Sequence, residues 1–127
     1  MAYYFTKIIA RSFEETLTKL TDELKKEGFG ILTEIDVKET LKQKLNVDFR
    51  QYKILGTCNP PFAYQALQAE DKIGILLPCN VIIQEKGGQV EVSAIDPIET
   101  MKVVGNPELA ALAEQVQAKL KRVIANV

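Results

Sequence analysis

The sequence of 127 residues has the length of one domain with a single hydrophobic core. Hydrophobic residues make up 46% and charged residues 26%, which are ordinary globular values and exclude a disordered chain. The net charge is −1, and this lack of a basic excess argues against a protein that holds nucleic acid through its phosphates. We therefore expect residues 1–127 to form a single domain without a nucleic-acid partner.

The first part of the chain predicts a strand, a helix and a second strand. The segment Tyr3–Ala10 is rich in aromatic and β-branched residues, which favours a strand. Ser12 stands three residues before Glu15, the spacing of a capping box, and apolar residues then recur at helical spacing until Gly28 ends the helix. The segment Phe29–Val37 alternates as a half-buried strand, and the pattern predicts that its odd-numbered residues all face one way.

The middle of the chain predicts a short helix, a strand and another helix. Apolar residues recur every four positions over Val37–Leu45, which favours a helix. The segment Phe49–Cys58 favours a third strand. Asn59 is expected to cap a helix that Pro60 or Pro61 opens, because the fixed φ of proline suits the first helical turn.

The last part of the chain predicts a hairpin and a long helix. A fourth strand is expected over Ile73–Gln84, and its apolar residues on both faces indicate a central strand. Gly87 and Gly88 are typical of a hairpin turn, with Gln89–Ile95 as the returning strand. Asn106 and the proline after it predict the start of the last helix, which carries a continuous apolar stripe.

This order of elements predicts an α+β fold with two layers. Two long amphipathic helices would cover one face of a mostly antiparallel sheet, and the short helices would be insertions at the sheet ends. The other face also carries apolar residues, among them Leu76 and Ile82 of the expected fourth strand. An exposed apolar surface of that kind marks a partner or a ligand, and a second copy of the chain is the commonest solution.

No segment of the sequence predicts export or a membrane span. The N-terminus lacks the basic start and apolar stretch of a secretory signal, and the most apolar run, Ile73–Ile83, is too short to cross a bilayer. We expect a cytoplasmic protein without a membrane partner, with both cysteines reduced. The absence of histidine removes the commonest general base and transition-metal ligand.

The two cysteines lie in similar settings, each beside a proline or one residue from it and each followed by asparagine. Cys58 falls just before an expected helix start, where unpaired N–H groups stabilise a thiolate. Cys79 follows Pro78, which cannot donate to a sheet ladder and so predicts a bulge or an exposed edge nearby. Two buried, unreactive side chains are the plainest interpretation. A thiol redox site and a pair of metal-binding thiolates are the alternatives.

Polar residues near these segments have structural interpretations as well. Asn59 is interpreted as a helix cap rather than a ligand contact. Asn80 lies in an apolar strand and would need hydrogen-bond partners if it were buried. Glu34 and Asp36 point the same way on one strand, where the solvent face of that strand explains them better than a cation site.

Four segments, "ILTEIDV", "YKILGTCNPPFAYQAL", "IGILLPCNVIIQE" and "VSAIDP", have the order and spacing of the conserved domain of unknown function 302 family, which the chain resembles over nearly its whole length. The resemblance implies a fold like that of the TATA-binding protein group, with one curved antiparallel sheet and a strand-helix-four strands-helix plan. It also implies a small bacterial or archaeal homodimer, and it implies no reaction or cofactor. The positions that match the family signature form the candidate ligand or thiol site: Cys58, Asn59, Pro60, Pro78, Cys79 and Asn80.

Three functional hypotheses follow from these observations. The first is a non-enzymatic homodimer that binds a small molecule or a partner through the open sheet face, near the two cysteine segments. The second is a thiol-dependent redox protein that uses Cys58, with Cys79 as the resolving thiol. The third is a metal site shared across the dimer, because two cysteines in one chain are too few for a structural zinc site.

Overall fold

The computed structural model describes residues 2–127. Among these residues, no helix is both long enough and apolar enough to cross a membrane. In chain order the elements, with 3-10 helices labelled η, are β1 Tyr4–Ile9, α1 Phe13–Lys26, β2 Gly30–Asp36, α2 Val37–Leu45, β3 Tyr52–Cys58, α3 Pro60–Ala69, η1 Asp71–Leu76, β4 Cys79–Lys86, β5 Gln89–Ile95, α4 Pro97–Met101, η2 Lys102–Val104 and α5 Pro107–Asn126.

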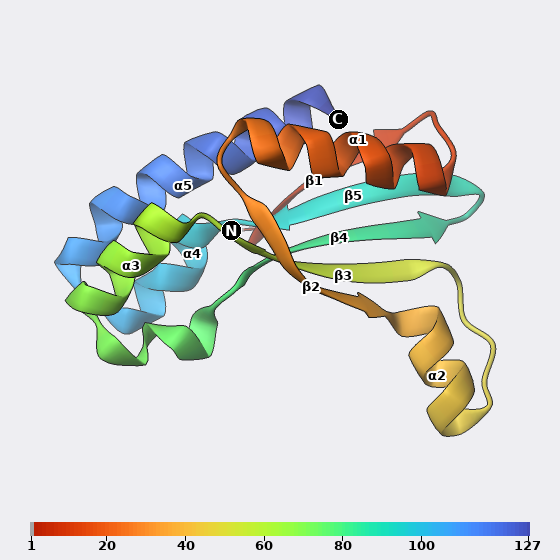
Figure 1. The fold of residues 1–127 in the computed structure, drawn as a ribbon, viewed down its shortest axis with the longest axis horizontal. Helices are drawn as coiled ribbons and strands as arrows, with labels where there is room; N and C mark the ends of the chain where they lie inside the picture. The colour runs from red at the N-terminus through yellow and green to blue at the C-terminus, as the bar shows by residue number, and fades with distance from the viewer. Residues whose placement is uncertain (1) are drawn as a thin grey trace.

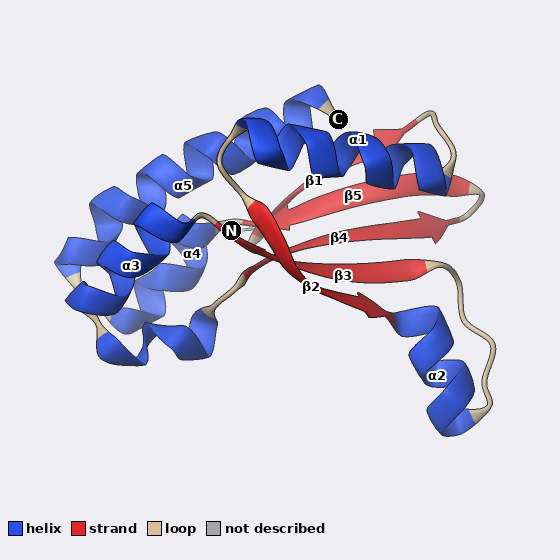
Figure 2. Ribbon diagram, viewed as in Figure 1, coloured by secondary structure: helices blue, strands red, loops and turns tan. Residues whose placement is uncertain are grey.

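The five strands form one antiparallel sheet in the order β1-β5-β4-β3-β2. Helices α1 and α5 lie side by side over one face of this sheet, as Figures 1 and 2 show. This arrangement confirms the predicted α+β fold with two long helices on one face. The order strand, helix, four strands, helix also holds, because α2, α3 and α4 are insertions between these elements.

The long helices and the hairpin begin and end where local sequence signals predict. Ser12 Oγ accepts from Glu15 N at 3.1 Å, and Glu15 Oε1 accepts from Ser12 N at 3.4 Å, which completes the expected capping box. Asn106 Oδ1 accepts a backbone N–H of the first turn of α5 at 3.0 Å. Gly87 and Gly88 turn the chain between β4 and β5 with φ angles of 59° and 78°, which only glycine adopts readily.

Buried apolar side chains form two separate groups. The main core lies between the sheet and the helices α1 and α5, with Leu20, Leu55, Ile83 and Leu120 among its fully buried members. A satellite cluster forms where α3, η1, α4 and the first half of α5 meet. It is built from Ala66, Ile73 and Leu109, with Ala69, Leu76, Leu77, Met101, Val104 and Leu112 packed around them.

The fourth strand is shorter than the sequence predicts. Residues Asp71–Leu76 form the 3-10 helix η1, and β4 starts only at Cys79. Pro78 accounts for this start, because it lacks the N–H of a sheet ladder and keeps the residue before it out of regular helix. The expectation that Leu76 lies on the free sheet face was therefore wrong, since Leu76 packs in the satellite cluster.

A β-bulge lies in β2 and not near Pro78, where the sequence predicts one. The pairing of β3 with β4 runs without a shift, whereas the pairing of β2 with β3 shifts between Ile31 and Thr33. The residue at the shift, Leu32, is 66% exposed. The bulge puts Ile31 on the helix side of the sheet and Thr33 on the opposite side, so the predicted single face of this strand was wrong.

The face of the sheet without helices, called the open face below, carries apolar residues in its centre. Thr6, Ser93, Ile82, Ile54 and Ile35 are cross-strand neighbours that form one row over all five strands. Ile82 and Ile54 are half-buried, and Ile35 is 47% exposed. The prediction of an apolar free face at Ile82 is confirmed, because alternate residues of these strands point away from α1 and α5.

Candidate functional site

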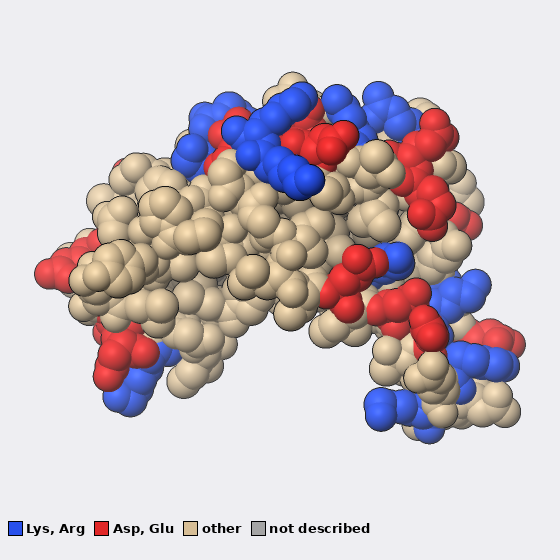
Figure 3. All heavy atoms as spheres, in the orientation of Figure 1, with Lys and Arg blue, Asp and Glu red and all other residues tan. Residues whose placement is uncertain are grey.

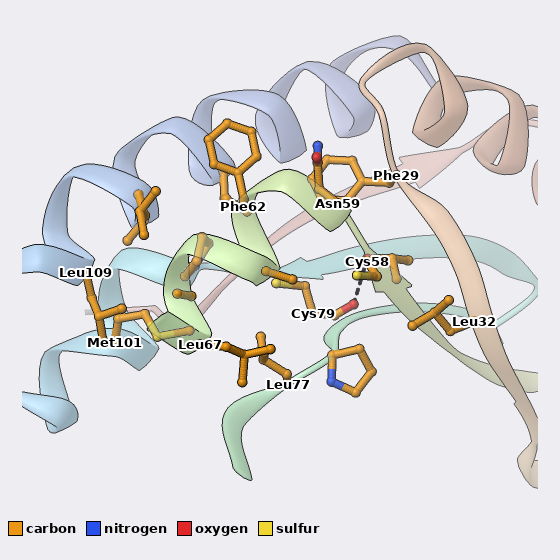
Figure 4. Close-up of a pocket in the computed structure, with 18 residues that line it drawn as sticks. Phe29, Leu32, Cys58, Asn59, Phe62, Leu67, Leu77, Cys79, Met101 and Leu109 are labelled. Carbon is orange, nitrogen blue, oxygen red and sulfur yellow. Dashed lines mark hydrogen bonds between the residues drawn. The ribbon is translucent and has the colours of Figure 1, made fainter. Parts of the chain in front are cut away.

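A pocket of about 320 Å³ lies between the main core and the satellite cluster, called the seam pocket below. Helix α3 forms one wall, and the first half of α5 forms another. The adjoining ends of β3 and β4 close it from the sheet side, and Figure 4 shows the lining residues. Its size lies at the lower end of the range of small-molecule pockets.

The two cysteine segments meet at this pocket because the strands that carry them are neighbours. Strand β3 ends at Cys58, β4 begins at Cys79, and Thr57 is the direct cross-strand partner of Cys79. Thr57 Oγ1 donates to the carbonyl oxygen of Cys79 at 2.7 Å, which is the dashed line in Figure 4. Cys58 and Cys79 are both free, half-buried thiols that line the pocket.

The environment of Cys79 keeps its thiol protonated. Burial, with a smaller contribution from the charge of nearby Cys58, raises the pKa of Cys79 to about 11. A thiol must ionise before it acts as a nucleophile or a metal ligand. At neutral pH, Cys79 is therefore a small apolar side chain of the pocket wall.

Asn59 occupies the N-cap position of α3, as the sequence predicts, but its side chain makes no cap hydrogen bond. Instead, Asn59 Nδ2 donates to the carbonyl oxygen of Glu27 at 3.0 Å, in the loop between α1 and β2. Pro61 removes one of the two backbone N–H groups from which an N-cap side chain can accept, and the bond to Glu27 uses the Asn59 amide instead. Asn59 is 8% exposed and lines the pocket.

Four of the six residues at the predicted site line the seam pocket: Cys58, Asn59, Pro78 and Cys79. The other two lie outside its lining. Pro60 is exposed at the first position of α3, and Asn80 is exposed with its side chain on the open-face side of β4. Because Asn80 is exposed, it does not need the buried hydrogen-bond partners that a buried strand position would require.

Sequence reasoning missed most of the wall opposite the cysteines. Phe62 and Ala66 of α3 and Leu109 and Leu112 of α5 line the pocket, as does Met101 of α4. The apolar stripes of the two helices marked four of these residues as buried but did not show what they face. No sequence signal pointed to Met101, because its position depends on how α4 packs against α5.

Acidic side chains near the sheet edge have structural partners. Glu34 accepts from Lys53 Nζ at 2.7 Å, and Asp36 accepts the N–H of Glu39 as the N-cap of α2. Within residues 2–127, no three side chains of His, Cys, Asp or Glu gather at one point. The seam pocket is lined by the two cysteines, the polar residues Thr57 and Asn59, and otherwise by apolar residues.

The surface around the mouth of the seam pocket is uncharged and partly apolar. Leu32 and Leu67 line the pocket and are 66% and 44% exposed, and Tyr64 on the same helix as Leu67 is 65% exposed. Figure 3 shows that the surface over α3 and the first half of β2 lacks charged side chains, while charges gather over α1 and α2. Apolar molecules therefore meet no charged barrier at the entrance.

The fold and the pocket define a class of small α+β domain with one helical layer and an apolar pocket at one end of its sheet. The chain belongs to the family described as domain of unknown function DUF302, whose model matches residues 5–127. The crystal structure of an uncharacterized conserved protein DUF302 from Bacillus stearothermophilus is 27% identical, has a TM-score of 0.93 and aligns over 99% of this chain and 98% of that one. A search of curated proteins finds no match.

Proposed function

We propose that this protein is a non-enzymatic binding domain and that the seam pocket holds one small, uncharged, mostly apolar ligand. The observation that carries this proposal is a pocket of about 320 Å³ without an Asp, Glu, Lys or Arg side chain among its lining residues. Ligand pockets of proteins are typically concave and apolar, with a few polar groups that fix the orientation.

The chemistry of the lining decides which ligands are compatible. A charged group inside the pocket would lose its hydration and find no opposite charge, at a cost of several kcal/mol. The Cys79 sulfur does not change this conclusion, because its raised pKa keeps that thiol neutral. The buried part of the ligand is thus uncharged, and any charged group it carries stays at the mouth near Leu32 and Leu67.

A thiol-dependent reaction is the second candidate function. It is favoured by one observation: Cys58 and Cys79 line the same pocket and are close enough to interact electrostatically. The raised pKa of Cys79 opposes it, because a resolving thiol works as its thiolate. A metal site shared by two copies is a third hypothesis, to which each copy would contribute only these two sulfurs.

We propose further that the chain forms a homodimer through its open face. The support is the apolar row Ile82, Ile54 and Ile35, together with Ile8 on β1, which is 51% exposed on the same face. In a two-layer domain this face of the sheet is exposed to water unless another molecule covers it. A second copy of the chain would cover it with an identical apolar face. This dimer surface would be separate from the seam pocket, which lies on the helix side of the sheet end.

We also propose that the chain is a single domain and that it is located in the cytoplasm. The pairing of β1 with β5 brings residues 4–9 and 89–95 together in one sheet, which supports a single folding unit over residues 1–127. Two free thiols without a disulfide agree with a reducing compartment, so we propose the cytoplasm as its location.

A binding experiment tests the pocket. N-phenyl-1-naphthylamine is an uncharged fluorescent probe that brightens in apolar surroundings, and we expect it to bind the native protein at one site per chain. Ala113 of α5 lines the pocket, whereas Ala110 of the same helix is exposed to solvent. Ala113→Leu should fill part of the pocket and weaken probe binding by about tenfold or more, while Ala110→Leu should leave it unchanged.

A second variant guards against a folding defect. Ala63 of α3 lines the opposite wall and is half-buried, so Ala63→Leu fills the same space from a less tightly packed position. Thermal melts of all variants show whether the fold is kept. Absence of probe binding by the native protein, or equal binding by both pocket-filling variants and by Ala110→Leu, would refute the proposed function.

A further inference from the structure

The seam pocket contains a polar side chain that uses only one of its two polar atoms in a hydrogen bond. Apart from the two thiols, Thr57 and Asn59 are the polar residues of the lining. The Thr57 hydroxyl is engaged, since it donates to the Cys79 carbonyl at 2.7 Å. Asn59 differs because only its nitrogen is engaged, in the bond from Nδ2 to the Glu27 carbonyl.

The orientation of the Asn59 amide is fixed by its surroundings. A backbone carbonyl only accepts hydrogen bonds, so the nitrogen of the amide must face Glu27 and the oxygen must face away from it. The Glu27 residue is itself anchored, because its Oε1 accepts from Arg122 Nη2 at 2.9 Å and from Arg122 Nε at 3.1 Å. Gly28 leaves room for the amide, since a Cβ there would lie 3.1 Å from Asn59 Nδ2.

The oxygen of this amide has no protein partner among residues 2–127. The N-terminus of α3 does not use it, because no side-chain cap bond forms there. Every fully buried side-chain nitrogen and oxygen in the same residues has a hydrogen-bond partner, so the unpaired Oδ1 is an accessible atom of a side chain that is 8% exposed. Figure 4 shows Asn59 beside Phe29 on the α5 side of the pocket. An acceptor without a partner on a residue that lines an apolar pocket fits a ligand that brings a donor.

We propose that the ligand of the seam pocket is an apolar molecule with one uncharged hydrogen-bond donor, a hydroxyl of an alcohol, and that Asn59 Oδ1 accepts this hydrogen bond. The inference rests on the proposed function and narrows it to a ligand class. The apolar part of such an alcohol lies against α3 and the first half of α5, and its hydroxyl lies beside Asn59. A pure hydrocarbon or an ether fills the same space without this bond.

Two isomeric probes test the inference, namely 1-octanol, which has a hydroxyl donor, and heptyl methyl ether, which has none. Both are measured by competition against N-phenyl-1-naphthylamine, on the native protein and on Asn59→Ala. A hydrogen bond of ordinary strength should make the native preference for the alcohol about fivefold larger than that of Asn59→Ala. Comparing the two preferences removes the difference in hydration between the probes, because that difference is common to both proteins.

A second measurement on the native protein does not require that Asn59→Ala folds. The side-chain carbonyl carbon of labelled Asn59 should shift in NMR spectra when 1-octanol binds and stay in place when the ether binds. Equal preferences in both proteins, or equal carbon shifts with both probes, overturn the inference and leave the pocket proposal intact. Failure of both probes to bind the native protein overturns the proposed function itself.

Discussion

The reactivity of Cys79 provides a quantitative prediction from the geometry of the seam pocket. At pH 7.5, a thiol with the ordinary pKa of 9.0 is about 3% ionised, whereas a thiol with a pKa of about 11 is about 0.03% ionised. Because only the thiolate attacks iodoacetamide, the shift alone slows alkylation of Cys79 about a hundredfold. Packing against the main core restricts access of the reagent and adds to this effect.

The assay uses a Cys58→Ser variant, so that Cys79 is the only thiol that reacts. Alkylation by iodoacetamide at pH 7.5 is followed by intact mass in buffer and again in about 8 M urea. This urea concentration is expected to unfold a small domain. The unfolded chain serves as the control, because its thiol has neither the burial nor the raised pKa. We expect the native rate to be lower by about two orders of magnitude or more.

Native and unfolded rates within tenfold of each other would show that the Cys79 thiol is neither buried nor protonated as described. That result would remove the argument for a neutral pocket wall and would favour the thiol-dependent alternative. Rapid alkylation of Cys58 in a Cys79→Ser variant would also favour the thiol-dependent alternative, because that alternative needs a reactive Cys58.

Three further predictions concern stability and assembly. The free energy of unfolding should fall by about 1 kcal/mol from pH 8 to pH 10 in the native protein relative to Cys79→Ala, because the unfolded thiol ionises above pH 9.0 while the folded one stays protonated up to about pH 11. Gly56→Ala should lower that free energy by about 1–3 kcal/mol in denaturant titrations, because the new Cβ would overlap Thr33 Oγ1 and lie 2.8 Å from Pro78 Cγ. In light scattering, the native protein should have a molar mass about twice the 14.2 kDa of one chain, and Ile35→Glu should have the molar mass of one chain.

Matched controls separate these effects from general damage. Gly74→Ala adds the same methyl group where nothing lies within 4 Å, so it should change stability by less than about 0.5 kcal/mol. Leu45→Glu adds a charge at a residue that is 65% exposed on α2 and should leave the dimer mass unchanged. A monomeric native chain, or identical pH dependence with and without Cys79, would contradict the corresponding prediction.

Most of the fold could be predicted from the sequence because its signals are local. The capping box at Ser12 and Glu15, the cap at Asn106 and the Gly87-Gly88 turn each act within a few residues. The start of β4 could not be predicted from hydrophobicity, because a short apolar run such as Ile73–Leu76 suits a buried strand and a buried 3-10 turn equally well. The bulge at Leu32 also has no local signal, since it depends on how β2 registers against β3.

The candidate site could be predicted only on its sheet side. Cys58 and Cys79 drew attention because they are the only cysteines, and their neighbouring strands bring them to one pocket. The opposite wall depends on the crossing of α3 over α5, and no pattern in a single sequence encodes that crossing. Asn59 was assigned to the correct helix position but with the wrong hydrogen bond, because its amide donates to Glu27, a partner 32 residues away that no local pattern indicates.

Helix α5 is a rigid link between the two parts of the molecule that enclose the seam pocket. Over 20 residues it extends about 30 Å, and its first half belongs to the satellite cluster while its second half belongs to the main core. The small satellite cluster buries far less apolar surface, so amide hydrogens of α3 and of the first turns of α5 should exchange with deuterium sooner than those near Leu120. A molecule bound in the seam pocket contacts both clusters and should slow that exchange. A ligand would thus stabilise the end of the protein that holds the satellite cluster, without a change in the structure of the sheet.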